Sequence, residues 1–239
     1  MKYFLLRRFR WSVALFAFLG LSLSAFPAST SIVIGFVGGH VKKDNSVHSE
    51  VQLATRLQAD YASGVQVRMY QNRDGAQARQ EVLRLLDTNQ DGSLSAEEKS
   101  DARISIYGHS WGASESVTLA RALGEEGVPV SLIVLVDSVR KRGENNQTIP
   151  PNVAEAINFY QQDGLLHGLA EIRAADASRT QILGNFKMDY KNNTVDCGGY
   201  PWFARTFMKQ HIEIESDPSV WGRVESLIRS KLPALDRAN

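Results

Sequence analysis

The sequence predicts an α/β fold, in which a doubly wound, mostly parallel sheet of about five strands is flanked by helices. Two observations carry this prediction. Short runs rich in β-branched residues alternate along the chain with segments whose apolar residues recur at helical spacing, which is the pattern of βαβ units. The run VSLIVLV at 130–136 is almost continuously apolar, as expected for a strand that is covered on both faces.

The predicted elements follow one another in a regular order. SIVIGFV is β-branched and ends at a Gly-Gly pair, VQVRMY alternates like a strand, and RISIY leads into a glycine-rich turn. The expected strands, with sheet order 2-1-3-4-5, are 31–37, 65–70, 103–107, 130–136 and 181–186. The expected helices are 48–61, 75–86, 113–126, 152–162 and 218–232. Longer loops are expected at 138–151 and 187–210, and the second loop is rich in aromatic residues.

The composition and the amino terminus narrow the class of protein. A chain of 239 residues is long enough for one domain, and a net charge of +1 argues against a nucleic-acid partner. The first ten residues are basic, and the uncharged run 11–26 that follows is shorter than the roughly 20 residues of a spanning helix. We therefore expect a signal peptide over 1–25, cleaved near Ala25, and a single domain over 26–239. The mature chain should be secreted or periplasmic, monomeric, and without a stable membrane span.

The stretch GHSWG at 108–112 predicts a nucleophilic serine. It lies between the predicted strand 103–107 and the predicted helix 113–126, which is the context that gives a Gly-x-Ser-x-Gly pentapeptide its meaning. The glycines permit a sharp turn that exposes the serine hydroxyl, and the helix start supplies free amides for an oxyanion. Through this elbow the sequence resembles the α/β-hydrolase family, and the resemblance implies that Ser110 is the nucleophile.

Family order places the acid after the serine and the histidine after the acid. Of the two histidines that follow Ser110, His211 precedes the final helix, where the resemblance implies the base, and His167 lies in a middle segment and is expected to be structural or exposed. Asp137 ends the apolar strand 130–136 at the carboxyl edge of the sheet, so it is the preferred acid. Asp189 and Asp196 remain open as later alternatives.

The resemblance also implies an oxyanion hole made of two backbone amides. One donor is expected from Trp111, which follows the nucleophile. The other is expected from the turn after the first strand, IVIGFVGG, in which Ile34 replaces the family's histidine. By position Phe36 supplies this amide, with Val37 as the neighbouring alternative.

A second motif, DTNQDGSLSAEE at 87–98, matches the calcium loop of an EF-hand. The expected ligand positions, in order, are Asp87, Asn89, Asp91, Ser93 through its carbonyl, Ser95 through water, and Glu98, with Gly92 at the sharp turn. The sequence contains no second loop of this kind, and little chain remains for an exit helix before strand 103–107 begins. We therefore expect a structural Ca²⁺ ion that joins helix 75–86 to the nucleophile strand.

Taken together, these residues predict an exported serine hydrolase, esterase or lipase-like, that cleaves a small-molecule or lipid ester through an acyl-enzyme. Two alternatives stay open. One is a non-catalytic calcium-binding protein of the same fold, and the other is an amidase or peptidase with the same triad, because this fold hosts many chemistries. Cys197 is the only cysteine, so no disulfide forms within one chain, and we expect it to be a bystander thiol.

Overall fold

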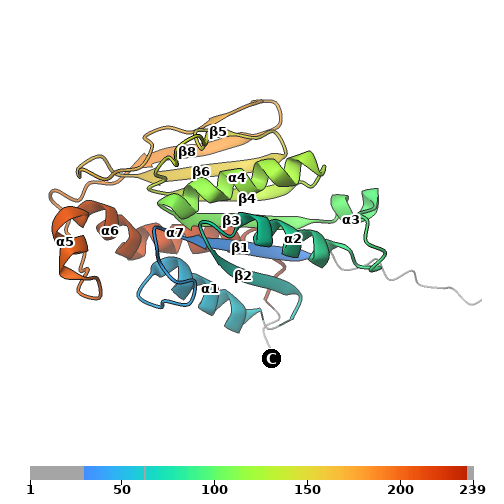
Figure 1. Cartoon of the computed structure of the whole chain (residues 1–239), viewed down its shortest axis with the longest axis horizontal. Coiled ribbons are helices and arrows are strands. Elements are labelled where there is room, and N and C mark those ends of the chain that lie inside the picture. Colours follow the sequence, from blue (N-terminus) through green and yellow to red (C-terminus); the bar gives the residue numbers. More distant parts are fainter. Residues whose placement is uncertain (1–29, 62, 236–239) are drawn as a thin grey trace, which may run out of the picture.

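A six-stranded parallel sheet forms the centre of the molecule (Figure 1). The computed structural model describes residues 30–61 and 63–235, so the expected signal peptide lies outside the described residues. The strand order is β2-β1-β3-β4-β6-β8, and every neighbouring pair is parallel. The strands are β1 Ser31–Val37, β2 Val65–Gln71, β3 Arg103–His109, β4 Val130–Val136, β6 Val153–Tyr160 and β8 Gln181–Lys187. A small separate sheet pairs β5, Thr148–Ile149, with β7, Arg173–Ala174.

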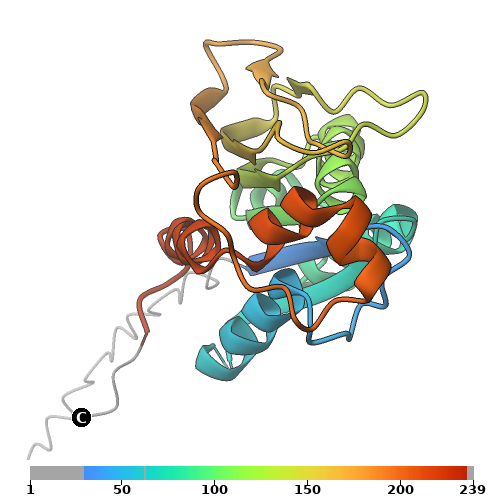
Figure 2. The same ribbon diagram turned by 90° about the vertical axis from the view of Figure 1, so that its left-hand side faces the viewer.

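Helices cover both faces of the sheet, which confirms the doubly wound α/β class (Figure 2). Helices α2, Gly75–Leu86, and α4, Trp111–Glu125, pack on one face, and α1, Ser49–Asp60, and α7, Pro218–Arg229, pack on the other. Strand β4 sends Ile133 and Leu135 into the first layer and its neighbours Leu132 and Val134 into the second. This double burial is the reason for its almost continuously apolar sequence. Three shorter helices complete the chain: α3 Ala96–Ser100, α5 Trp202–Phe207 and α6 Lys209–Ser216.

One predicted element is wrong. The segment 152–162 was expected to be a helix, but it forms β6 and lies between β4 and β8. Pairing on both sides and full burial of Phe159 outweigh the weak helical preference of the segment. Strand 181–187 is therefore the sixth strand of the sheet rather than the fifth.

Because all six strands are parallel, their carboxyl ends meet at one edge of the sheet, where ligands bind in folds of this type. Helices α5 and α6 lie beyond this edge, and α3 lies at the opposite end (Figure 1). The triad candidates and the 87–98 loop are thus at opposite ends of the molecule. Within the described residues, no helix is long and apolar enough to span a membrane.

Candidate active site

The predicted nucleophile lies in a strained turn between β3 and α4. Ser110 has φ 57° and ψ −124°, a region that residues other than glycine seldom occupy. Its flanking glycines allow the close approach that the turn requires. A Cβ on Gly108 would lie 2.5 Å from the Gly112 carbonyl carbon, and one on Gly112 would lie 2.3 Å from the Phe36 carbonyl oxygen. Only glycine therefore lets α4 start directly over the end of β1.

Three residues from distant parts of the chain meet at this turn. The Oγ of Ser110 lies 2.9 Å from Nε2 of His211, and Nδ1 of His211 lies 2.6 Å from Oδ2 of Asp137. His211 is on α6, and Asp137 follows the last residue of β4. All three side chains are buried, and Asp137 is fully so. The carboxylate oxygen can only accept, so Nδ1 carries the proton and Nε2 is free to accept from the serine hydroxyl.

The Asp137 carboxylate is held from every side by donors. Its Oδ1 accepts from the backbone N–H of Gln161 at 3.1 Å and of Gly168 at 2.8 Å, and its Oδ2 also accepts from the Gln161 side chain at 2.8 Å. Four donors, with His211 included, satisfy a buried charge that would otherwise be very costly. Three of these donors come from the loop that follows β6, and no sequence motif marks this loop.

The alternative triad residues lie apart from Ser110. Asp189 accepts from the backbone of Lys191, and Asp196 accepts from the backbone of Gly198, each within its own exposed turn. His167 is exposed, and its Nδ1 lies 3.2 Å from the neighbouring carbonyl oxygen of Gly168. Cys197 is a free, partly buried thiol. None of these side chains has a hydrogen bond to the triad within the described part of the chain.

The backbone around Ser110 offers amides for an oxyanion. Trp111 is the first residue of α4, so its N–H has no partner within the helix. Phe36 lies inside β1, in register with Tyr70 and Gly108. In the same turn Gly38 lies close to the nucleophile, since an added Cβ would lie 3.0 Å from the Ser110 Cβ. Phe36 and Val37 remain predictions as donors, and the geometry adds Gly38 to them.

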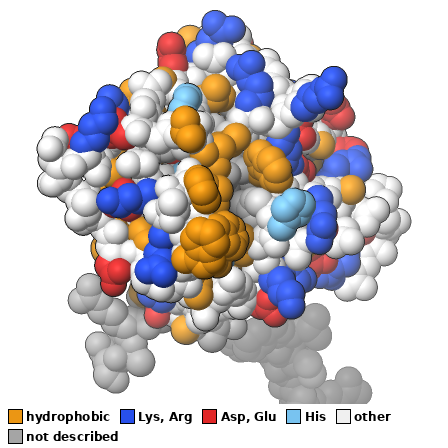
Figure 3. Space-filling view, turned by 60° about the vertical axis from the view of Figure 1, so that its left-hand side comes forward, with side chains coloured by type: hydrophobic (Ala, Val, Ile, Leu, Met, Phe, Trp, Pro, Cys, Tyr) orange, Lys and Arg blue, Asp and Glu red, His pale blue; other side chains and the backbone are white. Residues whose placement is uncertain are grey.

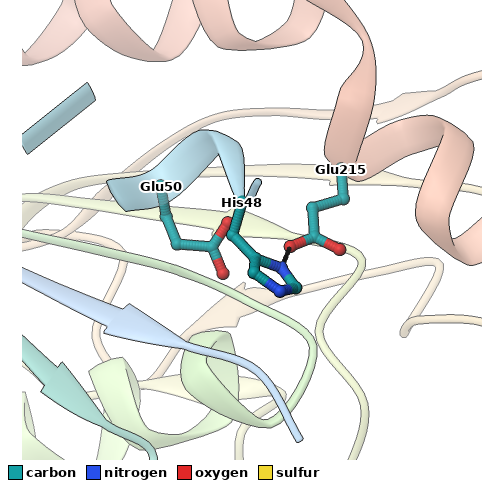
Figure 4. A group of neighbouring side chains, drawn as sticks. All are labelled: His48, Glu50 and Glu215. Atoms are coloured by element: carbon teal, nitrogen blue, oxygen red, sulfur yellow. Dashed lines mark hydrogen bonds and ion pairs between the residues drawn. The ribbon is translucent and has the colours of Figure 1, made fainter. Parts of the chain in front are cut away.

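A second group of buried polar side chains lies behind the triad and was not anticipated from the sequence. The ring of His109 lies 4.4 Å from that of His211, and its Nε2 lies 3.2 Å from the His211 carbonyl oxygen. Behind His109 are three further residues, His48, Glu50 and Glu215, shown in Figure 4. Glu215 lies 167 positions after His48, so no local spacing could have indicated the group.

Burial dominates the protonation of this second group. It lowers the pKa of His109 well below its ordinary value, and the nearby His211 and His48 lower it further. Burial raises the pKa of Glu215 to about 7. It also raises the pKa of Glu50 well above its ordinary value, and the charge of Glu215 acts in the same direction.

The 87–98 loop has the turn and the oxygen-rich composition that its motif predicts. Gly92 has φ +84°, and the N–H groups of Asp91 and Gly92 donate to the Asp87 carboxylate at 3.1 and 3.0 Å. Ser95 caps α3 in a capping box with Glu98. Hydrogen bonds from the backbone of Ser95, and then from the Thr88 side chain, lower the pKa of Glu98 to about 2.

The atoms that this loop could offer to a metal ion are all oxygens, the ligand atoms that calcium prefers. The loop carboxylates are nevertheless engaged by backbone amides, and Glu98 accepts from the N–H groups of Thr88 and Ser95 at 2.8 and 3.0 Å. Among the described residues, the only three His, Cys, Asp or Glu side chains whose ligand atoms lie within 4.8 Å of one another are His48, Glu50 and Glu215.

The face of the molecule that carries α5 exposes several large apolar side chains. Hydrophobic side chains gather in the middle of this face (Figure 3). The side chains Trp202, Phe203 and Phe207 of α5 are 68%, 51% and 63% exposed, and Trp111, next to the nucleophile, is 37% exposed. Helix α5 leads directly into α6, which carries His211, so the apolar face adjoins the triad. Two hollows of about 480 Å³ each lie elsewhere, one beside the 87–98 loop and one at the amino ends of β4 and β6.

Comparison with known proteins finds no family model and no curated protein that matches the chain. Solved structures that resemble it include a thermostable esterase from Pseudomonas putida, with 10% sequence identity and a TM-score of 0.46 over 88% of this chain and 77% of the esterase. A cutinase-like protein from Cryptococcus sp. has 14% identity and a TM-score of 0.43 over 85% of this chain and 97% of its own. An esterase from Pyrobaculum calidifontis has 11% identity and a TM-score of 0.39 over 84% and 77%.

Proposed function

We propose that this protein is a serine hydrolase that cleaves carboxylic esters through an acyl-enzyme. The observation that supports it is the chain of contacts from the Ser110 hydroxyl to Nε2 of His211 and from Nδ1 of His211 to Asp137, at 2.9 and 2.6 Å. A serine in a sharp strand-to-helix turn, a base within hydrogen-bond reach and a buried carboxylate behind that base are the parts that acyl transfer requires.

The proposed reaction has two halves. His211 accepts the hydroxyl proton as Ser110 attacks the ester carbonyl, and it then donates that proton to the departing alkoxide as the acyl-enzyme forms. Water, deprotonated by His211, then attacks the acyl carbonyl, the bond from that carbon to the Ser110 Oγ breaks, and His211 returns the proton to Oγ as the acid is released. Asp137 keeps the proton on Nδ1 and stabilises the imidazolium in both halves. The oxyanion accepts from the N–H of Trp111 and from an amide of the β1 turn, at Phe36, Val37 or Gly38.

The surroundings of the triad favour an apolar acyl group or a lipid ester. The exposed aromatic side chains of α5 and Trp111 offer apolar contact area near the nucleophile. We propose that the protein acts outside the cytoplasm as a monomer, in keeping with the leader expected at 1–25.

The test combines active-site labelling with a substrate series. A fluorophosphonate probe should label the wild type and not Ser110→Ala. p-Nitrophenyl esters of increasing acyl length, hydrolysed by the wild type and the same variant, give the chain-length preference. Hydrolysis of anilides instead of esters would indicate an amidase, and a folded, unlabelled and inactive wild type would refute the proposal.

We also propose a structural calcium ion in the 87–98 loop. The Asp87, Asn89 and Asp91 side chains, the Ser93 carbonyl and Glu98 would hold it, with Ser95 contributing through water. For Glu98 to bind the ion, it must exchange its hydrogen bonds with Thr88 for the metal, since these now use one of its oxygens. The ion would supply only cohesion between α2 and β3, because this loop lies at the opposite end of the sheet from Ser110.

A further inference from the structure

The buried group behind the triad joins two elements that are far apart in the sequence. His48 and Glu50 are at the start of α1, and Glu215 is near the end of α6, four residues after His211. The carboxylates of Glu50 and Glu215 lie on either side of the His48 imidazole (Figure 4). The three side chains offer one ligand atom each, all within 4.8 Å of one another. Glu50 is fully buried, and Glu215 and His48 are 3% and 8% exposed.

This group holds more lone pairs than donors. Nε2 of His109 faces the His211 carbonyl, which can only accept, so Nε2 carries the proton of the neutral ring. Nδ1 of His109 is then bare, yet it faces Oε2 of Glu215 at 3.4 Å. Two acceptors that face each other repel unless a cation or an extra proton lies between them.

The Glu50 carboxyl group also lacks a hydrogen-bond donor in the described part of the chain. Its two carboxylate oxygens are buried and face no hydrogen-bond donor among the described residues, and the group within their reach is the Glu215 carboxylate, itself an acceptor when ionised. Glu215 has more support, since Nδ1 of His48 donates to its Oε1 at 2.5 Å and the Tyr200 hydroxyl lies within reach of the same carboxyl group. The described ion pairs give Glu215 only imidazole partners and give Glu50 none. Buried carboxylates are normally paired with a cation or bound to a metal.

We propose that His48, Glu50 and Glu215 bind a divalent transition-metal cation, with zinc as the best-fitting ion. Two carboxylates neutralise its charge, and the imidazole nitrogen selects a transition metal over Ca²⁺ or Mg²⁺, which prefer oxygen ligands alone. Ligands of a tetrahedral zinc lie about 3.3 Å apart at ordinary bond lengths of ~2.0–2.1 Å. The His48 and Glu215 atoms, now 2.5 Å apart, need to separate by less than about 1 Å to admit the ion.

The ion would be structural rather than catalytic. It would tie the start of α1 to α6, the helix that carries His211, and His109 would bridge between the metal site and the catalytic ring. This site does not depend on the proposed hydrolase function, because its predicted properties are binding and stability. It is also separate from the 87–98 loop, which contributes none of its residues.

The test is metal binding by the untagged mature chain, stripped with a chelator and then dialysed against zinc. Elemental analysis should find one zinc per chain, and a hundredfold excess over the dissociation constant should raise the melting temperature by about 5–10 °C. Cobalt in place of zinc should give visible d–d absorption. Glu50→Gln should lower the zinc affinity at least about a hundredfold and abolish the cobalt band.

Two control variants separate this site from other sources of zinc. Glu98→Gln, in the 87–98 loop, and Cys197→Ser, which removes the single thiol, should each keep the full zinc content. The stability difference between Glu50→Gln and the wild type should also change sign with the metal. Without zinc the variant should be at least as stable as the wild type, and with zinc it should be less stable. A wild type that retains no zinc and shows no thermal shift, or a Glu50→Gln variant that binds zinc as well as the wild type, would overturn the proposal in favour of a shared proton.

Discussion

The exchange of Asp137 for asparagine tests the triad geometry most sharply, because every partner of this carboxylate is a donor. The backbone N–H groups of Gln161 and Gly168 hold one oxygen, and the Gln161 side chain and His211 hold the other. An asparagine must direct its NH₂ group at one of these pairs. Its carbonyl oxygen will face the two backbone amides, which cannot change their role. The positive φ of Asp137, 44°, is tolerated by asparagine, so the backbone need not move.

The NH₂ group of the new side chain then faces Nδ1 of His211, which becomes the acceptor. The imidazole proton moves to Nε2, and the base can no longer accept the proton of Ser110. We expect kcat for p-nitrophenyl esters to fall about 10⁴-fold with little change in KM, which corresponds to a rise of about 5.5 kcal/mol in the activation free energy. The NH₂ group also faces the donor Nε2 of Gln161, so that charge-assisted bond is lost and the bond with His211 becomes a neutral one; together these changes should cost about 2–4 kcal/mol of unfolding free energy.

The assay is steady-state kinetics together with calorimetry on the wild type and three matched variants. Asp189→Asn and Asp196→Asn should retain wild-type kcat, because these carboxylates bond only within their own turns. The melting temperature of Asp137→Asn should drop by about 5–10 °C. Near-normal turnover of Asp137→Asn, or a large loss in either control, would refute the assignment of the acid.

Three further predictions follow from named contacts. Ser110→Ala and His211→Ala should each abolish fluorophosphonate labelling and ester hydrolysis, and the double variant should be little worse, whereas strictly additive losses would argue against a shared mechanism. Calcium at a hundredfold excess over its dissociation constant should add about 2–3 kcal/mol to the unfolding free energy of the wild type and so raise its melting temperature, and it should leave Glu98→Gln unchanged. Equal melting curves with calcium and with EDTA would show that the loop binds no ion. Gly112→Ala should destabilise by at least about 1–3 kcal/mol, because its Cβ would overlap the Phe36 carbonyl oxygen, whereas Gly222→Ala in open space on α7 should stabilise by about 0.5–1 kcal/mol; calorimetry of both variants checks the sign.

The sequence alone was enough to predict most of the architecture. Apolar runs such as 130–136 and the helical spacing of 75–86 are local signals, and the structure has β4 and α2 where they were expected. The one wrong element, 152–162, is a segment whose local preference is weak and whose strand state depends on pairing with β4 and β8. Local sequence cannot report such pairing, because its stabilising contacts come from residues about 20 or more positions away.

The candidate site divides in the same way. The GHSWG turn marks Ser110, because a strand, two glycines and a helix start are adjacent in the chain. Chain order left His167 and His211, and the resemblance to the α/β-hydrolase family favoured His211 because it precedes the final helix. Asp137 was preferred to Asp189 and Asp196 because it follows a predicted strand, but only the tertiary structure shows which carboxylate lies next to the imidazole, that of Asp137 at 2.6 Å. Only the folded chain brings Glu215 to His48 and Glu50, since it lies 167 positions after His48 and reaches it because α1 and α6 pack against each other.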